Sequence, residues 1–343
     1  MEKKIVSSWF NGKCLPENYI IPPEKRPGEL CVPTCEIPII DLSKAKGNER
    51  EIIIDQIMEA CKKFGFFQVI NHGVEKDIMD EAMKVFMEFF ELPYEEKSHL
   101  YSEESNVKCR LYTSSYNYAN EDIHYWRDCL KHTCTPLKDC IHYWPQKPSR
   151  YWKVVGEYST RVRELGLRIL ELINEGLKLE EGYLRKGYSE ESFMSVNHYP
   201  PCPDPRLTLG LPKHCDPNLI TLLLQGNIPG LQVCVDNQWL LIQPSPHAFV
   251  VNMGFQMQVI SNGKLKSAEH RVVTNAHKAR TTAAFFILPS KDKIIQPAKS
   301  LIKNGDSPLF KQFQYADFVE TFKACSVKGP ESTTVLDHFK IKI

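Results

Sequence analysis

The chain has 343 residues, enough for one large domain or two of ordinary size. Its hydrophobic content of 42%, charged content of 25% and formal net charge of +1 are ordinary for a globular protein and exclude nucleic acid as an expected partner. The twelve cysteines contain no C-x-x-C pair, and the chain shows neither a membrane-spanning apolar run nor an N-terminal secretory segment. We therefore expect a cytoplasmic protein with reduced thiols that does not enter membranes.

The front half of the chain is predicted to be mainly helical. A proline-rich stretch of about 35 residues comes first, and short strands are expected at 37–42 and 66–70. Apolar residues recurring at three- and four-residue steps predict amphipathic helices that include 54–64, 78–90 and about 152–177.

The sequence pattern changes from about residue 193, where short apolar runs alternate with Pro, Gly and Asn. Strands are expected at 218–224, 231–235, 239–243, 248–252, 271–273 and 283–288, followed by a helix over 315–325. This spacing predicts an antiparallel β-sandwich or barrel. The chain is therefore expected to be mainly β with α, divided into a helical and strand domain with the variable substrate wall (1–150), a long supporting helix (151–192), a β core (193–295) and a C-terminal helix and tail (296–343).

His214, Asp216 and His270 form the pattern that carries the most chemistry. His214 and Asp216 stand two residues apart at the expected start of a strand, so alternation directs both side chains to one face, and the strand after His270 could lie across the sheet. Two histidines and one carboxylate on one face of an octahedral ion leave positions open for a co-substrate and O2, as a non-haem Fe(II) oxygenase requires. A structural zinc site would close all four positions, and a satisfied polar pair is the alternative for the first two residues.

Arg280 and Thr282 follow in strand alternation. An arginine in an apolar strand is costly unless it is paired, and a bidentate carboxylate of a small dicarboxylate ligand would pair it. The alternative partner is a protein carboxylate such as Glu269.

These motifs resemble those of the plant 2-oxoglutarate, Fe(II)-dependent dioxygenases. The matching segments are Asn197 to Pro203, His214-x-Asp216, His270 to Val273, Arg280-x-Thr282 and, in the front half, Phe66 to Gly73. The likeness is closest to two branches, the hyoscyamine 6-hydroxylases and the group of salicylate hydroxylases and flavone synthases. It implies a double-stranded β-helix (jelly-roll) core supported by N-terminal and long interdomain helices.

The resemblance also implies the cofactors. Fe(II) would be bound by His214, Asp216 and His270, and 2-oxoglutarate would chelate the iron while its far carboxylate lies on Arg280 and Thr282. Tyr199 would donate a further hydrogen bond to the co-substrate, with Asn197 close by. O2 is the expected oxidant, and ascorbate is expected to support activity.

The substrate wall is less clearly marked. Phe286 shares the face of Arg280, and in the family this position often contacts the organic substrate. Tyr116, Tyr118, Trp126 and Arg127 are candidates from the front half, and Phe255 stands where many members carry an acid. Core packing is the alternative for the aromatic residues. His124, His132, Cys134, Cys140 and His142 lack tight ligand spacing and are not expected to bind a metal.

We therefore expect an oxidoreductase, acting as a monomer, that hydroxylates an unactivated carbon of a small plant specialised metabolite (alkaloid, phenolic or flavonoid) and releases succinate and CO2. The same oxidative chemistry ending in desaturation, ring closure or epoxidation is the first alternative. A non-catalytic barrel that binds a small molecule is the second, and a zinc-structural barrel is the third.

Overall fold

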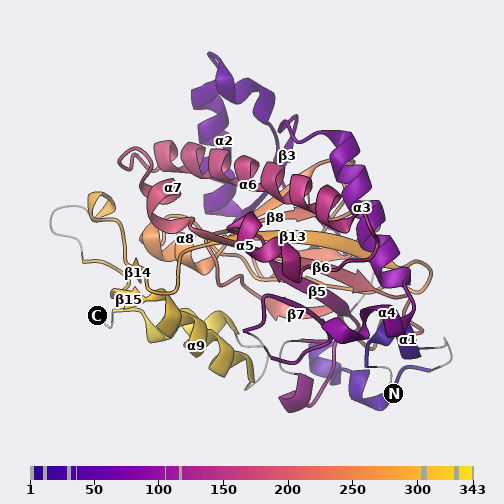
Figure 1. Cartoon of the computed structure of the whole chain (residues 1–343). Coiled ribbons are helices and arrows are strands. Elements are labelled where there is room, and N and C mark those ends of the chain that lie inside the picture. The colour runs from indigo at the N-terminus through magenta and orange to yellow at the C-terminus, as the bar shows by residue number, and fades with distance from the viewer. Residues whose placement is uncertain are drawn as a thin grey trace.

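Two β-sheets form the centre of the molecule in the computed structural model, which describes residues 4–10, 14–28, 32–35, 37–104, 106–115, 118–302, 307–327 and 332–341 (Figure 1). The strands are β1 (Thr34–Cys35), β2 (Ile39–Asp41), β3 (Phe66–Ile70), β4 (Cys109–Thr113), β5 (Asp128–Thr133), β6 (Glu191–Tyr199), β7 (Leu211–His214), β8 (Ile220–Leu224), β9 (Leu231–Val235), β10 (Gln238–Ile242), β11 (Phe249–Met253), β12 (His270–Val272), β13 (Arg280–Leu288), β14 (Ile294–Ile295) and β15 (Phe313–Gln314). The helices are α1 (Val6–Trp9), α2 (Arg50–Lys63), α3 (Lys76–Glu91), α4 (Tyr94–Lys97), α5 (Leu137–Cys140), α6 (Tyr151–Gly176), α7 (Tyr183–Tyr188), α8 (Phe255–Ile260) and α9 (Tyr315–Val327).

The larger sheet has eight strands in the order β2-β3-β11-β8-β13-β6-β5-β4, and the smaller has five in the order β1-β10-β9-β12-β7. Their pairings are antiparallel apart from β1 with β10 and β2 with β3. Consecutive strands such as β7 and β8 lie in different sheets, which is the connectivity of a double-stranded β-helix. The predicted mainly β jelly-roll with supporting helices is confirmed.

Side-chain alternation gives the large sheet two different faces. Along β13, Ala283, Phe285 and Ile287 point to one face and belong to the main apolar core. Helix α6 covers this face (Figure 1), and its approach is so close that a Cβ on Gly166 would lie 2.3 Å from Cδ1 of Ile287. The opposite, inner face carries Arg280, Thr282 and Phe286, so the helices hold the sheet from outside and leave its inner face for the site.

The front half contributes more to the sheet than the sequence predicted. Strands β4 and β5 pair with each other and β5 pairs with β6, so they extend the eight-stranded sheet. Neither segment shows apolar alternation, because Arg110 and Lys131 occupy inward positions, and the pattern therefore predicted no strands there. The domain boundary at residue 150 stays a prediction. Strands β2 to β5, which precede it, share one sheet with strands of the β core.

The helices were predicted well where one apolar face packs on the core. The helix expected over 54–64 matches α2 to within one residue of its end, the next lies within α3, the long one follows α6, and the C-terminal one lies within α9. Across the residues that the structure describes, no helix is long and apolar enough to cross a membrane.

Candidate metal and co-substrate site

The structure brings His214, Asp216 and His270 together at the end of the jelly-roll. One ligand atom from each lies within 4.8 Å of the others, and no other such triad of His, Cys, Asp or Glu occurs among the described residues. Oδ1 of Asp216 is 3.6 Å from Nε2 of His214 and 3.6 Å from Nε2 of His270. Three donor atoms therefore converge on one point from one side, as the sequence predicted.

The strands place the two histidines opposite each other. His214 is the last residue of β7 and pairs in register with His270, the first residue of β12. The prediction that His214 and Asp216 open one strand is wrong, because β7 ends at His214 and Asp216 lies in the connection to β8. Pro217 follows Asp216, has no N–H to donate to a ladder and restricts the backbone of Asp216, so β7 does not continue through this connection.

Hydrogen bonds orient each of the three side chains. Nδ1 of His214 donates to the carbonyl oxygen of Pro212 (2.9 Å), and Nδ1 of His270 donates to that of Ala268 (3.1 Å). Both imidazoles therefore keep the lone pair of Nε2 for a metal.

The carboxylate of Asp216 is oriented from behind. Its Oδ2 accepts hydrogen bonds from Oγ1 of Thr221 (2.5 Å) and Nδ2 of Asn252 (2.8 Å), which leaves Oδ1 facing the histidines. Sequence analysis missed these two supporting residues, because their contacts to Asp216 depend on the pairing of β8 with β11.

The electrostatics of the triad favour a bound cation. Burial, together with the neighbouring His270, lowers the pKa of His214 to about 4, so its imidazole is neutral at pH 7. Burial alone would raise the pKa of Asp216, but the two imidazoles and the Thr221 and Asn252 hydrogen bonds lower it below its usual value. Neutral imidazole and ionised carboxylate are the forms that bind a divalent metal.

We expect Thr221→Val to weaken Fe(II) binding by about 10- to 100-fold, the usual effect of losing an outer hydrogen bond to a ligand. A metal titration of the purified apoprotein measures this affinity. Thr160→Val is the matched control, because it removes a hydroxyl that bonds to a carbonyl oxygen of α6, on a side chain exposed to solvent. Equal Fe(II) affinity in the Thr221 variant and the control would contradict the assigned role of Thr221.

A glycine positions the backbone of Asp216. The N–H of Phe255, at the start of α8, donates to the carbonyl oxygen of Asp216 (2.8 Å), and the N–H of Gly254 donates to that of Leu219 (2.9 Å). The two segments approach so closely that a Cβ on Gly254 would lie 2.0 Å from the carbonyl oxygen of Asn218. Only a residue without a side chain fits here.

We expect Gly254→Ala to lower the free energy of unfolding by about 3 kcal/mol, the upper end of the usual cost of overpacking, because backbone atoms must move to relieve the clash. The same shift would displace Asp216, so the folded fraction should also bind Fe(II) less tightly. Gly187→Ala in α7 is the control, since a Cβ there meets no atom within 4 Å and should stabilise by about 0.5–1 kcal/mol. Urea denaturation measures both, and a neutral Gly254 substitution would refute the argument.

A second group lies on the inner face of the large sheet. Arg280 pairs in register with Tyr199, and Thr282 with Asn197, and all four residues are buried. Nη1 of Arg127 donates to Oδ1 of Asn197 (3.1 Å) and so orients its amide. The four residues that the sequence assigned to the co-substrate are therefore neighbours.

Arg280 has an unfilled hydrogen-bonding position. It is 2% exposed, its Nε donates to the carbonyl oxygen of Ile228 (2.9 Å), and its buried Nη2 has no hydrogen-bond partner. In the described part of the chain no carboxylate lies within 4 Å of it, and Glu269, the alternative partner, instead faces Lys213 at 4.0 Å. A buried, partnerless guanidinium nitrogen fits the carboxylate of a ligand.

The candidate substrate residues fall into two groups. Phe286 is half-buried on the inner face, and its ring stacks on that of Phe193 with the centroids 4.5 Å apart. Trp126 is 0% exposed and its indole N–H donates to the carbonyl oxygen of Pro200. Phe255 is 2% exposed and packs on Phe318 of α9. Burial favours the core-packing alternative for Trp126 and Phe255.

Of the two tyrosines assigned to the wall, the structure describes only Tyr118. Tyr118, at the start of the short 3-10 helix Tyr118–Asn120, is half-buried and stacks on His124 with ring centroids 4.0 Å apart. Tyr116 lies outside the described residues, and its assignment to the wall remains a prediction from sequence.

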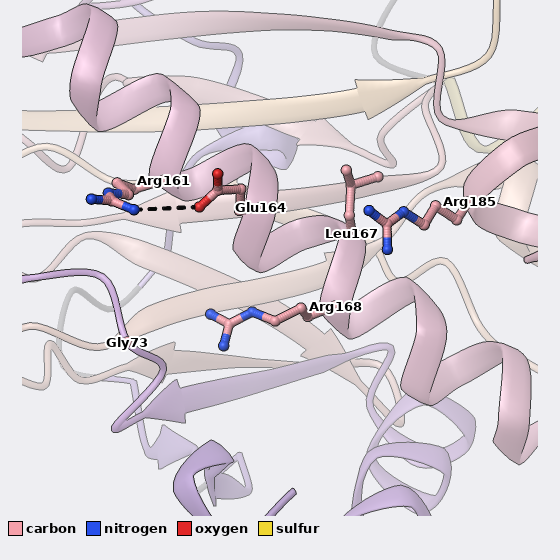
Figure 2. A pocket seen from close by; sticks show the side chains of 6 residues that line it. All are labelled: Gly73, Arg161, Glu164, Leu167, Arg168 and Arg185. Atoms are coloured by element: carbon pink, nitrogen blue, oxygen red, sulfur yellow. Dashed lines mark ion pairs between the residues drawn. The ribbon is translucent and has the colours of Figure 1, made fainter. Parts of the chain in front are cut away.

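A cavity of about 370 Å³ lies at a different place, around the outer side of α6 (Figure 2). Figure 2 shows Arg161 paired with Glu164 on α6. Arg168 is on the same helix, and Arg185 comes from α7. The lining residues are Gly73, Arg161, Glu164, Leu167, Arg168 and Arg185, none of which belongs to the triad. Arg185 also pairs with Glu171. Because the cavity shares no residue with the triad, it is not the site of the chemistry described above.

Comparison with known proteins defines the class. A family model for the 2OG-Fe(II) oxygenase superfamily matches residues 190–289, and one for the non-haem dioxygenase in morphine synthesis N-terminal domain matches residues 37–153. With the relatives described next, these matches show that the chain belongs to the 2OG-Fe(II) oxygenase superfamily. It is therefore an oxidoreductase whose cofactors are Fe(II) and 2-oxoglutarate.

The chain is similar to plant proteins over nearly their whole length. Protein DOWNY MILDEW RESISTANCE 6 of Arabidopsis thaliana is 44% identical over 94% of this chain and 95% of its own. Hyoscyamine 6-dioxygenase of Hyoscyamus niger is 42% identical over 92% and 94%. The crystal structure of JOX2 in complex with 2OG, Fe and JA matches with a TM-score of 0.85 at 32% identity, covering 98% of this chain and 96% of that one.

Proposed function

We propose that this enzyme hydroxylates an unactivated carbon of a small plant specialised metabolite and releases succinate and CO2. The observation that carries the proposal is the buried Nη2 of Arg280, which lacks a hydrogen-bond partner and lies on the inner face of the sheet that also supports Asp216. A sensor or structural barrel has no need to keep a buried guanidinium ready for a second ligand, whereas an oxygenase must bind its co-substrate beside the metal.

The residues would divide the work between two groups. His214, Asp216 and His270 would bind Fe(II), while Arg280 and Thr282 would bind the far carboxylate of 2-oxoglutarate, with Tyr199 and Asn197 beside it. When bound, Fe(II) and 2-oxoglutarate supply the activation of O2 that amino-acid side chains cannot provide.

The protein's own contribution is orientation and exclusion of water. The Nδ1 hydrogen bonds keep both imidazoles aimed at the metal, and the ring of Phe66 packs edge-on against His270 with the centroids 5.2 Å apart. Burial around Arg280 strengthens its attraction for a carboxylate, because little water competes for the guanidinium.

The alternative outcome is desaturation, ring closure or epoxidation with the same cofactors, and the non-catalytic barrel is the alternative of a different class. We also propose that the protein is a cytoplasmic monomer. Size-exclusion chromatography with light scattering tests the oligomeric state.

The decisive experiment incubates the purified protein with Fe(II), 2-oxoglutarate, ascorbate and a plant extract. Hydroxylation predicts succinate and a metabolite that has gained one oxygen atom, and desaturation predicts one that has lost two hydrogen atoms. Absence of succinate under all conditions, including the slow uncoupled reaction without substrate, would refute the enzyme assignment. The Asp216→Ala protein is the control for adventitious iron.

A further inference from the structure

Two cations, the half-buried Lys131 and the buried Arg110, lie on the inner face of the large sheet away from the co-substrate residues. Lys131 on β5 pairs in register with Ser195 of β6 and with Arg110 of β4, and Ser195 pairs with Ala284 of β13. Side chains of residues paired in register share a face, so Lys131 and Arg110 point to the same side as Thr282 and Phe286.

A stack of two aromatic rings connects Lys131 with the triad. Nζ of Lys131 lies 3.9 Å from the centroid of Phe193, whose ring stacks on Phe286. Phe286 in turn pairs with Thr221 of β8, the residue that donates a hydrogen bond to Asp216. The apolar surface of the two rings therefore leads from the ammonium group toward the metal ligands.

Neither cation has a protein counter-ion. Among the residues that the structure describes, no carboxylate lies within 4 Å of Lys131 or Arg110. Arg110 is 2% exposed, its Nη1 donates to the backbone carbonyls of Glu103 and Glu104, and its buried Nε has no partner. Burying Arg110 without a counter-ion is unfavourable, and the half-buried Lys131 beside it stays accessible to a ligand, so the arrangement favours an anion that binds both cations.

The charged groups around Lys131 strengthen this argument. Burial and the nearby Arg110 lower the pKa of Lys131 to about 8; Lys323 of α9 acts in the same direction, and the Cys129 thiol opposes it. Lys131 is therefore still largely protonated at pH 7 but surrounded by like charge. A cationic amine would be repelled here, whereas a carboxylate would be attracted.

The anion cannot be the far carboxylate of 2-oxoglutarate. Arg280 pairs with Tyr199 at the end of β6, and Lys131 pairs with Ser195 four residues earlier. At about 3.3 Å per residue, the two pairing positions are roughly 13 Å apart along the strand. One small dicarboxylate bound at Arg280 and the metal does not also reach Lys131.

We propose that Lys131, with Arg110 beside it, binds the carboxylate of the organic substrate, so that the substrate is a small acid whose apolar, planar body lies on Phe193 and Phe286. This inference rests on the proposed function and adds the chemical class of the substrate. Of the alkaloid, phenolic and flavonoid substrates that the sequence left open, it excludes those that carry a protonated amine.

The test measures binding of benzoate, with benzamide as the uncharged probe of the same shape. Calorimetry is done under nitrogen with Fe(II) and saturating 2-oxoglutarate, so that Arg280 is occupied and no turnover occurs. We expect wild-type protein to prefer benzoate to benzamide, and Lys131→Met to weaken benzoate binding by roughly 10- to 100-fold while leaving benzamide binding unchanged. Lys131→Arg should retain the preference.

Controls separate charge from packing. Lys153→Met, on the solvent-exposed side of α6, should bind benzoate like wild type. Because Lys131 is cationic only below its pKa, benzoate affinity of the wild-type protein should fall as the pH rises above about 8, and that of Lys131→Arg should not. Equal binding of benzoate and benzamide by wild type, or an unaffected Lys131→Met variant, overturns the proposal.

Uncoupled succinate formation keeps the two proposals distinguishable. If wild type and Lys131→Met both form succinate slowly from 2-oxoglutarate but show no preference for benzoate, the substrate class is wrong and the enzyme assignment stands. If wild type forms no succinate at all, the proposed function fails independently of the benzoate result.

Discussion

Asp216→Ala is expected to abolish 2-oxoglutarate turnover and to lower Fe(II) affinity by more than about 100-fold, the upper end of the loss seen when an outer partner of a ligand is removed. Asp216 would supply the single anionic ligand atom of the triad, and its Oδ1 is equidistant, at 3.6 Å, from the Nε2 atoms of both histidines. Without it, two imidazoles remain, and a metal-bound imidazole supplies no negative charge that opposes dissociation of a divalent cation.

Metal analysis after dialysis and succinate release measure the two effects on the same preparation. The variant should fold, because Thr221 and Asn252 lose a shared acceptor while the backbone bond from Phe255 to the carbonyl oxygen of residue 216 remains. Asp55→Ala, on the exposed face of α2, is the matched control and should keep both iron and turnover. An Asp216 variant that retained iron and activity would mean that another carboxylate completes the site.

The sequence predicted the site best where a long regular strand carries it. Arg280 and Thr282 lie in the nine-residue strand β13, so simple alternation placed them on one face, and the register with Tyr199 and Asn197 agrees. Asp216 shows the opposite case. It lies beyond the end of β7, and its position depends on hydrogen bonds from Thr221 and Asn252, which follow it by 5 and 36 residues in the chain. No local sequence pattern encodes these contacts.

The substrate side could not be predicted for a related reason. Strands β4 and β5 carry the charged residues Arg110 and Lys131 on their inner face. They therefore lack the apolar periodicity that marks a strand. The role of these cations could not be predicted because it depends on the register of β4, β5 and β6, which places Lys131 beside Phe193. Trp126, by contrast, was assigned from residue type alone, and burial beneath the N-terminal segment gives it a packing role.

Arg280→Met is expected to raise the 2-oxoglutarate concentration needed for half-maximal turnover by roughly 10- to 150-fold, because it removes a charge-assisted hydrogen bond contributing about 1.5–3 kcal/mol. Turnover at saturating 2-oxoglutarate should fall much less, since the triad is untouched. Arg280→Lys keeps the charge but loses the planar pair of donors, so we expect an intermediate value.

Protein stability gives an independent reading of the same substitution. Burial lowers the pKa of Arg280, and its Nη2 lacks a partner, so the guanidinium is unfavourable in the protein without co-substrate. Methionine fills similar space without charge, and we expect the apoprotein of Arg280→Met to be at least as stable as wild type. Addition of 2-oxoglutarate at 100 times the wild-type Kd, with a redox-inert divalent metal present, should stabilise wild type by about 2.7 kcal/mol and the variant by much less.

Arg206→Met is the matched control, because this arginine is exposed and pairs only with the nearby Asp204. It should leave both 2-oxoglutarate affinity and ligand-induced stabilisation unchanged. A less stable apoprotein combined with normal 2-oxoglutarate binding would show that Arg280 supports the fold and that the co-substrate carboxylate binds elsewhere. If Arg280 is reserved for a ligand, the Arg280→Met apoprotein should be stable, and 2-oxoglutarate should no longer stabilise it.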